Sequence, residues 1–355
     1  MTLTSIPRPK SASPWKRRSS KVILATVLAS IVPALIAAFF IYSGVDATVG
    51  ALFVFLPLQL IAVATVGYWQ FGRGGVRDAI LVVGTIFLTT LVIVLLLSVL
   101  WSVIDQGSKV MSVSFLTQNN RYIAPSTSLE YGGVGHAILG SFITVGLTTI
   151  VAVPLGLGIS IFLTETRSRF RGPIRVLVQA MSGLPSVVAG LFVYTAFLGT
   201  GILGPSLLAG SIALIPLMLP TVARVAEEAL RLVSKDLRNG ALALGASSLR
   251  AFFQVTLPAA RTGVVTALIL GLSRVVGETA PLLLTVGTAN LTIVNPLEAA
   301  ATLPTYIYGY LGLAKDTSIS RAWGGALTIL LIVGLIFIIA RLVVRPVGAK
   351  RKANK

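Results

Sequence analysis

Two opposite charges stand within one hydrophobic stretch of the chain. Arg274 and Glu278 are four residues apart, inside an apolar run that extends from Val264 to Val286. If this run is a helix that enters a membrane near Val264, Arg274 lies ~15 Å deeper, close to the middle of a hydrocarbon core about 30 Å thick. A charge at that depth costs about 3 kcal/mol. A role in lining a path for an anion therefore competes with a purely structural ion pair.

The order and the surroundings of these charges favour the pathway. Arg before Glu is the poorer order for an ion pair at this spacing in a helix, so we expect partners beyond this helix. Gly277 and Pro281 bracket Glu278, and Pro281 cannot donate a hydrogen bond to the carbonyl of Gly277. The sequence predicts a kinked, polar centre in a membrane helix, which is typical of a pathway wall.

A polar segment, residues 234–258, precedes this stretch and is expected to fold as two short helices with a turn between them; we call it the elbow. Ser234 is expected to cap a short helix, which Gly245 then interrupts. Ser247 or Ser248 can start a second short helix. That helix is expected to end near Thr256, because the following Leu257-Pro258 disfavours helical geometry. Neither piece reaches the roughly 20 residues that a membrane crossing needs.

The spacing of the elbow resembles the cytoplasmic loop of permeases in ATP-binding-cassette (ABC) importers. That loop has the pattern Glu-Ala-Ala, three residues, Gly, nine residues, an aliphatic residue, one residue and Leu-Pro. The pattern falls here on Asn239, Gly240, Ala241, Gly245, Val255, Leu257 and Pro258. Asn239 replaces the acid and Gly240 the first alanine, which removes a possible ion pair with an ATPase but keeps the shape of the elbow. The competing interpretation is an ordinary amphipathic loop.

Longer stretches of sequence resemble one particular family of importer permeases. Five segments look like the PstA family of phosphate importer permeases: Phe115–Asn119, Ser182–Ser186, Ser273–Leu283, Pro296–Ala299 and Leu303–Tyr308. The resemblance extends from about Asp78 to Val347. It implies an all-α polytopic membrane protein with a type I ABC importer permease (MetI-like) fold in a prokaryotic inner membrane. It also implies that an arginine at position 224 accompanies Arg274 along the pathway; the competing interpretation of Arg224 is an interfacial cation that reaches toward lipid head groups.

The same resemblance implies partners and a source of energy. The expected partners are a homologous second permease (PstC-like), two ATPase subunits (PstB-like) and an extracytoplasmic phosphate-binding protein (PstS-like). No G-x-x-x-x-G-K-[ST] phosphate loop occurs in the sequence. We therefore expect no directly bound cofactor, and ATP with Mg²⁺ is expected to be used by the partner ATPase.

Composition sets the class of protein. The 355 residues are 55% hydrophobic and 11% charged, which excludes an ordinary soluble domain. About eight membrane spans are expected, each a long apolar run between polar breaks. They lie near residues 22–43, 50–70, 79–104, 134–164, 174–199, 205–223, 264–286 and 322–344.

The net charge of +18 agrees with one orientation of these spans. With both termini in the cytoplasm, the outer loops hold only four basic residues, Lys109, Arg121, Lys315 and Arg321. The positive-inside rule favours this topology. The basic excess is then explained by topology and anionic lipid, and no nucleic acid is needed as a partner.

The chain is expected to divide into four parts. Basic cytoplasmic tails cover 1–21 and 348–355, an extra transmembrane hairpin covers 22–70, and the permease domain covers 78–347 with its coupling loop at 234–258. We assign no function to the hairpin beyond packing against lipid.

Other polar residues have plainer interpretations. The break from Ser182 to Ser186 inside the fifth span either lines the pathway or satisfies a kink. Glu227 and Arg231 have the favourable spacing and order of a solvated helix pair. His136 is expected to be a hydrogen-bonded residue at the membrane boundary and not a metal ligand.

The sequence lacks the residues of an enzyme. It contains no cysteine, which excludes disulfides and thiolate sites, and no nucleophile, metal cluster or acid and base pair stands out. Three alternatives to a phosphate importer stay open: an importer for another oxyanion such as sulfate or molybdate, an ion-coupled secondary transporter, and a membrane scaffold or sensor.

Overall fold

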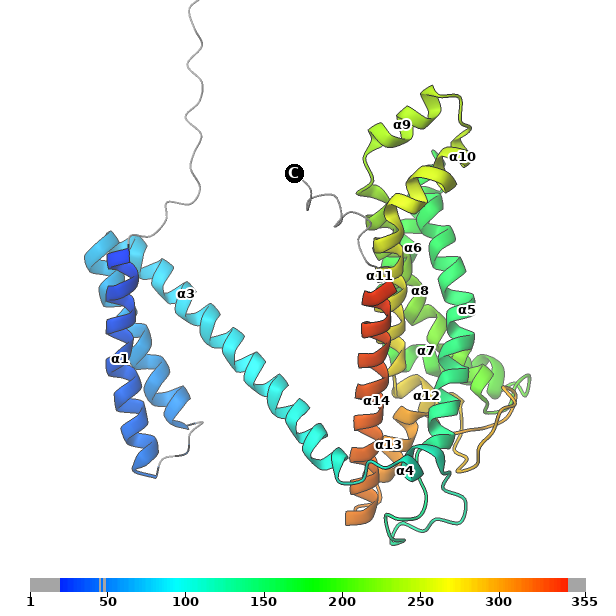
Figure 1. Cartoon of the computed structure of the whole chain (residues 1–355), viewed down its shortest axis with the longest axis horizontal. Coiled ribbons are helices and arrows are strands. Elements are labelled where there is room, and N and C mark those ends of the chain that lie inside the picture. The colour runs from blue at the N-terminus through cyan, green and yellow to red at the C-terminus, as the bar shows by residue number, and fades with distance from the viewer. Residues whose placement is uncertain (1–19, 45, 47–48, 344–355) are drawn as a thin grey trace, which may run out of the picture. The chain divides into compact units, whose positions relative to one another are not determined.

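The computed structural model describes residues 20–44, 46 and 49–343, and every regular element in that part of the chain is a helix (Figure 1). The predicted tails at 1–21 and 348–355 lie almost wholly outside the described residues. The helices run in the order α1 Ser20–Tyr42, η1 Gly50–Phe55, α3 Leu56–Ser108, α4 Val113–Thr117, α5 Gly135–Glu165, α6 Arg171–Ser182, α7 Ser186–Val193, η2 Tyr194–Leu198, α8 Leu207–Arg231, α9 Lys235–Ala243, α10 Ser248–Ala251, η3 Phe252–Thr256, α11 Leu257–Val276, α12 Ala280–Thr285, α13 Leu303–Leu311 and α14 Asp316–Val343. The segments η1, η2 and η3 are π-helical turns.

The chain forms two compact units, Met1–Leu100 and Trp101–Lys355. In the first unit, α1 packs against η1 and the start of α3. The amide of Gln59 donates a hydrogen bond to the hydroxyl of Ser30 at 2.6 Å. Helix α3 kinks at Gly72, whose φ of 64° is accessible chiefly to glycine. The two apolar helices before the kink, α1 and the first part of α3, pack side by side.

Helix α8 is the centre of the second unit. It packs along α5 and α11, and also contacts α6, α7 and α12. Its apolar residues, among them Leu214, Leu217 and Met218, are fully buried. A second apolar cluster around Phe115, Leu303 and Tyr306 closes the opposite end of the unit from the elbow. The second unit is thus a bundle with one helix surrounded by the others.

Two helices of this bundle are broken. Helix α6 ends at Ser182, and the chain turns by 100° before it continues as α7 and η2. Helix α11 ends at Val276, and α12 begins at Ala280. Both breaks fall where the sequence predicts polar interruptions.

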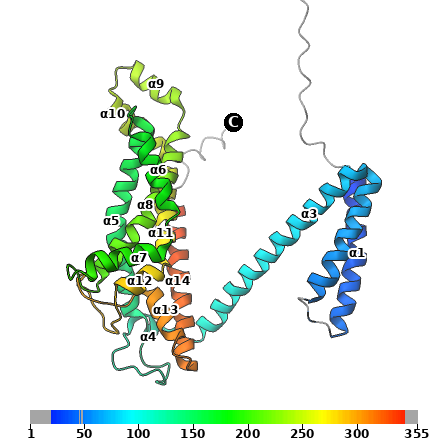
Figure 2. The same ribbon diagram turned by 180° about the vertical axis from the view of Figure 1, so that it is seen from behind.

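The second halves of the two broken helices lie against each other, α7 beside α12 (Figure 2). A Cβ atom built on Gly190 would stand 2.5 Å from the Cα of Pro281. Glycine is therefore the residue that permits this distance between the two backbones.

Most of the expected membrane spans are present as helices. Six helices in the described part are long and apolar enough to cross a membrane, and the bent pair α6 and α7 would make a seventh. The apolar part of α1, Val27–Tyr42, is shorter. The total of eight spans and the cytoplasmic position of both termini stay predictions.

We predict that Gly190→Ala destabilises the bundle, because the added methyl group must push α7 away from Pro281. Overpacking of this kind costs about 1–3 kcal/mol of unfolding free energy. Thermal unfolding of the purified chain in detergent measures it.

Gly146→Ala on α5 is the matched control, since its new Cβ would meet no atom within 4 Å. Equal melting temperatures for the two variants would contradict the close approach of α7 to α12.

Candidate functional site

The first half of the elbow folds as the sequence predicts. Ser234 caps α9 by accepting a hydrogen bond from the backbone N–H of Asp236 at 3.2 Å. Gly245 ends the helix with a φ of 86°. The N–H of Ala246 donates to the carbonyl of Ala241 at 3.1 Å, and the N–H of Gly245 donates to Leu242 at 3.0 Å. This is the Schellman motif, in which a glycine in the left-handed region satisfies the last carbonyls of a helix.

The second half of the elbow differs from the prediction. Ser247 is the residue that caps α10. The expected end near Thr256 is wrong, because α10 continues through η3 into α11 without a break. In η3 the N–H of Leu257 bonds to the carbonyl of Phe252, five residues back. This wider turn accommodates Pro258, which has no N–H to give and would crowd the preceding turn of an α-helix.

The elbow motif is distributed over this helix, turn and helix. Asn239, Gly240 and Ala241 lie on α9, Gly245 in the turn, Val255 in η3, and Leu257 and Pro258 at the start of α11. Large apolar side chains of the elbow are exposed: Leu237 by 54%, Leu244 by 92% and Leu249 by 72%. Apolar side chains gathered on a projecting segment are typical of a surface that docks a partner.

The break between α11 and α12 explains the order of the two charges. Arg274 lies in the last turn of α11, and Glu278 lies two residues before α12 begins. A cation is favourable at the carboxyl end of a helix and an anion at the amino end. The order that is poor in one continuous helix is therefore favourable for two half-helices.

Neither of these charges neutralises the other. Arg274 is exposed and Glu278 is partly buried. Within the described residues, no hydrogen bond or ion pair is made by the side chain of either one. The structure thus does not support a simple structural ion pair, and both side chains are available to a ligand or to another chain.

Arg224 has different neighbours from Arg274 and Glu278. It is an exposed residue of α8 that lines a cleft of about 190 Å³ with Arg175, Gln179 and Glu228. In the part of the chain that the structure describes, no hydrogen bond or ion pair joins Arg224 to Arg274 or Glu278. The pathway role of all three residues stays a prediction.

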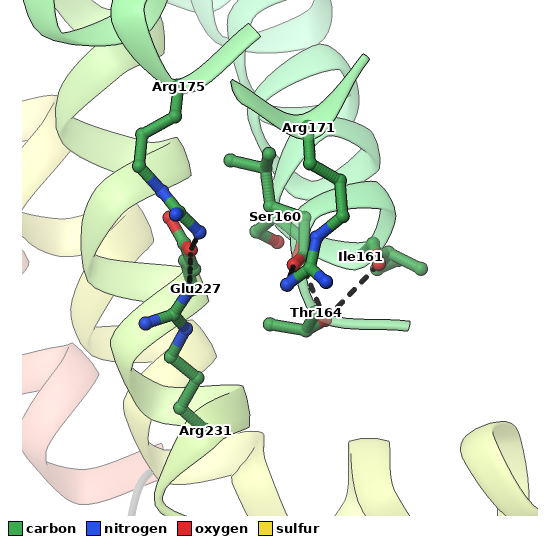
Figure 3. Close-up of polar contacts among 8 residues, drawn as sticks. Ser160, Ile161, Thr164, Arg171, Arg175, Glu227 and Arg231 are labelled. Atoms are coloured by element: carbon green, nitrogen blue, oxygen red, sulfur yellow. Dashed lines mark hydrogen bonds and ion pairs between the residues drawn. The ribbon is translucent and has the colours of Figure 1, made fainter. Parts of the chain in front are cut away.

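Glu227 is the centre of an ion bridge of which the sequence predicts one half, the pair with Arg231. Its Oε1 atom lies 2.7 Å from Arg175 of α6 and 2.6 Å from Arg231 of α8 (Figure 3). The predicted pair of Glu227 with Arg231 is confirmed, but the side chain of Glu227 is only 12% exposed, so its expected solvation is wrong. Arg175 is remote in sequence, and no local spacing reveals that α6 packs across this carboxylate.

The opposite end of the bundle is held by two buried polar residues. His136 is 1% exposed and packs edge-on against Tyr306, with ring centroids 5.7 Å apart. Among the described residues neither ring nitrogen has a hydrogen-bond partner, which differs from the expected hydrogen-bonded boundary residue. Burial raises the pKa of Tyr306, so its phenol stays neutral. This histidine is a packing residue.

Arg321 is also buried, although the sequence placed it in an outer loop. It belongs to α14, is 1% exposed, and its Nη2 atom donates to the carbonyls of Thr127, Ser128 and Tyr131 at 3.0 to 3.1 Å. These hydrogen bonds attach the loop between α4 and α5 to the amino-terminal part of α14.

Comparison with known proteins identifies the family. The model of the family described as binding-protein-dependent transport system inner membrane component matches residues 152–349. The chain belongs to this inner membrane component family. The matched segment contains both broken helices, the elbow, Arg224, Arg274 and Glu278.

Similar chains carry consistent names. The phosphate transport system permease protein PstA 1 of Mycobacterium tuberculosis is 35% identical over 76% of this chain and 88% of its own length. PstA of Haemophilus influenzae is 35% identical over 69% of this chain and 85% of its own. A solved structure of the MetNI methionine ABC transporter covers 60% of this chain and 93% of its own, with 18% identity and a TM-score of 0.48.

The inner membrane component family and the fold agree. An all-helical chain with six or more apolar helices of spanning length is a multi-pass membrane protein. The predicted class, an all-α polytopic transport permease, is confirmed. The relatives are named as permease proteins of phosphate transport systems.

We predict that Glu227→Ala destabilises the inner membrane component chain, because it leaves Arg175 and Arg231 without a shared partner. The arginines are about half exposed, so the expected loss is about 1–3 kcal/mol, between that of a surface pair and a buried one. Thermal unfolding at low and high salt measures it.

The neighbouring Glu228→Ala serves as the control, since Glu228 is exposed and makes no ion pair with any described residue. An equal loss in both variants would show that Glu227 acts only through the net charge of the chain.

Proposed function

We propose that this chain is the transmembrane permease subunit of an ATP-driven importer of inorganic phosphate. The observation that carries the proposal is the similarity, over about three quarters of the chain, to permeases named for phosphate transport. The free Arg274 at a helix break and the exposed elbow support it. The chain would form the translocation path, and no cofactor would bind to it directly.

Arg274 would contact the phosphate in the path. Its guanidinium group offers several N–H donors in a plane, which suits the oxygens of a phosphate. The side chain makes no contact with a carboxylate of the described residues that would occupy these donors. Arg224, which makes no ion pair with any described residue, would be a later contact on the way to the elbow end of the bundle.

Glu278 would contribute to selectivity. A carboxylate repels a fully ionised oxyanion, but it accepts a hydrogen bond from an anion that still carries a proton. Phosphate carries such a proton at neutral pH and sulfate does not. This difference favours phosphate over sulfate, the nearest alternative substrate, although an external binding protein would make the first choice.

The elbow would couple the permease to ATP hydrolysis on other chains. Two ATPase subunits (PstB-like) would bind the exposed leucines of α9 and α10, use ATP with Mg²⁺, and move the elbows when they close. A homologous second permease (PstC-like) would complete the path, and an external phosphate-binding protein (PstS-like) would deliver the substrate. The complex would lie in a prokaryotic inner membrane, with the elbow and both termini in the cytoplasm.

The domain bounds follow from the same proposal. Residues 78–347 would be the permease domain, 234–258 its coupling loop, and 22–70 an added hairpin. An ion-coupled secondary transporter is the alternative from another class. It would need no ATP and would give the elbow no docking role.

We predict that Arg274→Gln abolishes phosphate uptake into cells or proteoliposomes while the complex still assembles. The substitution keeps a polar side chain that can form hydrogen bonds but removes the charge that compensates the anion. Uptake of radioactive phosphate, sulfate and molybdate measures both the loss and the selectivity. Uptake equal to wild type in the variant would remove Arg274 from the path.

We further predict that a cysteine in the elbow crosslinks to an ATPase subunit. The chain has no native cysteine, so Ala241→Cys and Leu244→Cys each create a single reactive thiol. In the purified complex, a short thiol-to-amine crosslinker should join either thiol to an ATP-hydrolysing chain, identified by mass spectrometry.

Tyr131→Cys is the control for this experiment, because the loop that holds it lies at the end of the bundle opposite to the elbow. If the elbow thiols never trap an ATPase, or if Tyr131→Cys traps it equally well, the coupling role is lost.

A further inference from the structure

A polar cavity lies at the base of the elbow. It has a volume of about 400 Å³ and is enclosed by the end of α5, the start of α6, the end of α8, the start of α9 and η3. We call it the elbow-root cavity. Its size falls within the range of sites for small molecules, and five separate elements contribute to its wall.

The elbow-root cavity is rich in positive charge. Its lining contains the cations Arg171, Arg231, Lys235 and Arg238, and a single carboxylate, Glu165. Glu165 is already paired with Arg238 at 2.6 Å, and Arg231 is paired with Glu227. Arg171 and Lys235 therefore have no carboxylate partner among the described residues.

Two polar atoms in the wall of the cavity are buried and unpartnered. Thr256 of η3 is 4% exposed, and its hydroxyl oxygen makes no hydrogen bond within the part of the chain that the structure describes. The Nε atom of Arg171 is buried in the same way. One terminal nitrogen of Arg171 donates to the carbonyl of Leu163 at 2.6 Å, which anchors the guanidinium at the end of α5. Buried donors without partners are unfavourable, so they point to a ligand.

We propose that the elbow-root cavity binds a phosphate-bearing anion. The guanidinium of Arg171, the ammonium of Lys235 and the hydroxyl of Thr256 are three kinds of donor that phosphate oxygens accept from. The anion is either free inorganic phosphate or the head group of an anionic phospholipid. Basic pockets between membrane helices bind such head groups, and both sources present the same phosphate oxygens.

The proposal does not depend on the transport role of Arg274. The cavity lies at the elbow, whereas Arg274 lies at the far end of α11, 18 residues after Thr256. A bound anion would join α6, α9 and η3, which no ion pair of the described residues connects directly. Occupancy would therefore stiffen the base of the elbow.

The test uses the full-length chain with Arg274→Gln and Arg224→Gln, purified in a neutral detergent, so that neither proposed pathway arginine contributes binding. Two probes separate the sources of the anion: radioactive inorganic phosphate in equilibrium dialysis, and dioctanoyl phosphatidylglycerol in a thermal-shift titration. We expect saturable binding of at least one probe.

The decisive variant is Thr256→Val, which keeps the shape of the side chain and removes its hydroxyl. A hydrogen bond to a charged group is lost, so the affinity should fall about tenfold. Lys235→Gln, which leaves the buried wall intact, should weaken binding about threefold. Without ligand, Thr256→Val should melt at the wild-type temperature or above, because the lost hydroxyl has no partner in the protein.

Arg167→Gln is the matched control. Arg167 is an exposed cation of the connection between α5 and α6 that does not line the cavity, so its loss should change the affinity less than twofold. The proposal is overturned if neither probe binds saturably, if binding survives both Thr256→Val and Lys235→Gln, or if Arg167→Gln weakens it as much as they do.

The outcomes also separate this site from the path. Phosphate uptake that fails in the wild-type complex would refute the proposed function while leaving binding in the elbow-root cavity measurable. Conversely, normal uptake with no binding in the cavity would refute only the site.

Discussion

The distance between the two broken helices is the constraint on which the rest of the bundle depends. A helix that ends inside a membrane exposes backbone groups that lipid cannot satisfy. Here the second halves, α7 and α12, lie against each other, and the missing side chain of Gly190 allows the backbone of Pro281 to approach. The crossing buries the apolar parts of both half-helices against α8. It also fixes the position of the break that presents Arg274 and Glu278.

The elbow and this break are joined by one continuous helical segment, Ser248–Val276, which we call the rod. Helical structure runs from Ser248 through η3 to Val276, so Arg274 sits near one end of the rod and the elbow at the other. The π-helical turn at η3 is what makes continuity possible, because it takes Pro258 into the helix without ending it. A displacement of the elbow would therefore reach Arg274 through a rigid element and would not be absorbed by a flexible loop.

Much of this arrangement could be predicted from local sequence, because it depends on local rules. Long apolar runs predict the long helices, and Ser234 and Gly245 predict the two ends of α9. The polar and glycine residues around Ser182 and Gly277 predict the two breaks. The errors have a common origin in packing. The sequence predicts a helix end at Thr256, because a π turn has no sequence rule as strong as that for proline. It predicts a solvated Glu227, because the second partner of this residue, Arg175, comes from a helix and is 52 residues away in sequence.

Two kinds of contact hold the elbow and the bundle, and they differ in strength. The rod and α8 are held by apolar packing, in which Gly271 of α11 meets Val222 and Met218. The root of the elbow is held by ion pairs of partly exposed arginines with Glu227 and Glu165. Packing is stiff, whereas ion pairs with one exposed partner are weakened by salt and can exchange partners. The compliance of the bundle is thus concentrated at the root of the elbow, where ion pairs can exchange partners while apolar packing keeps Gly190 against Pro281.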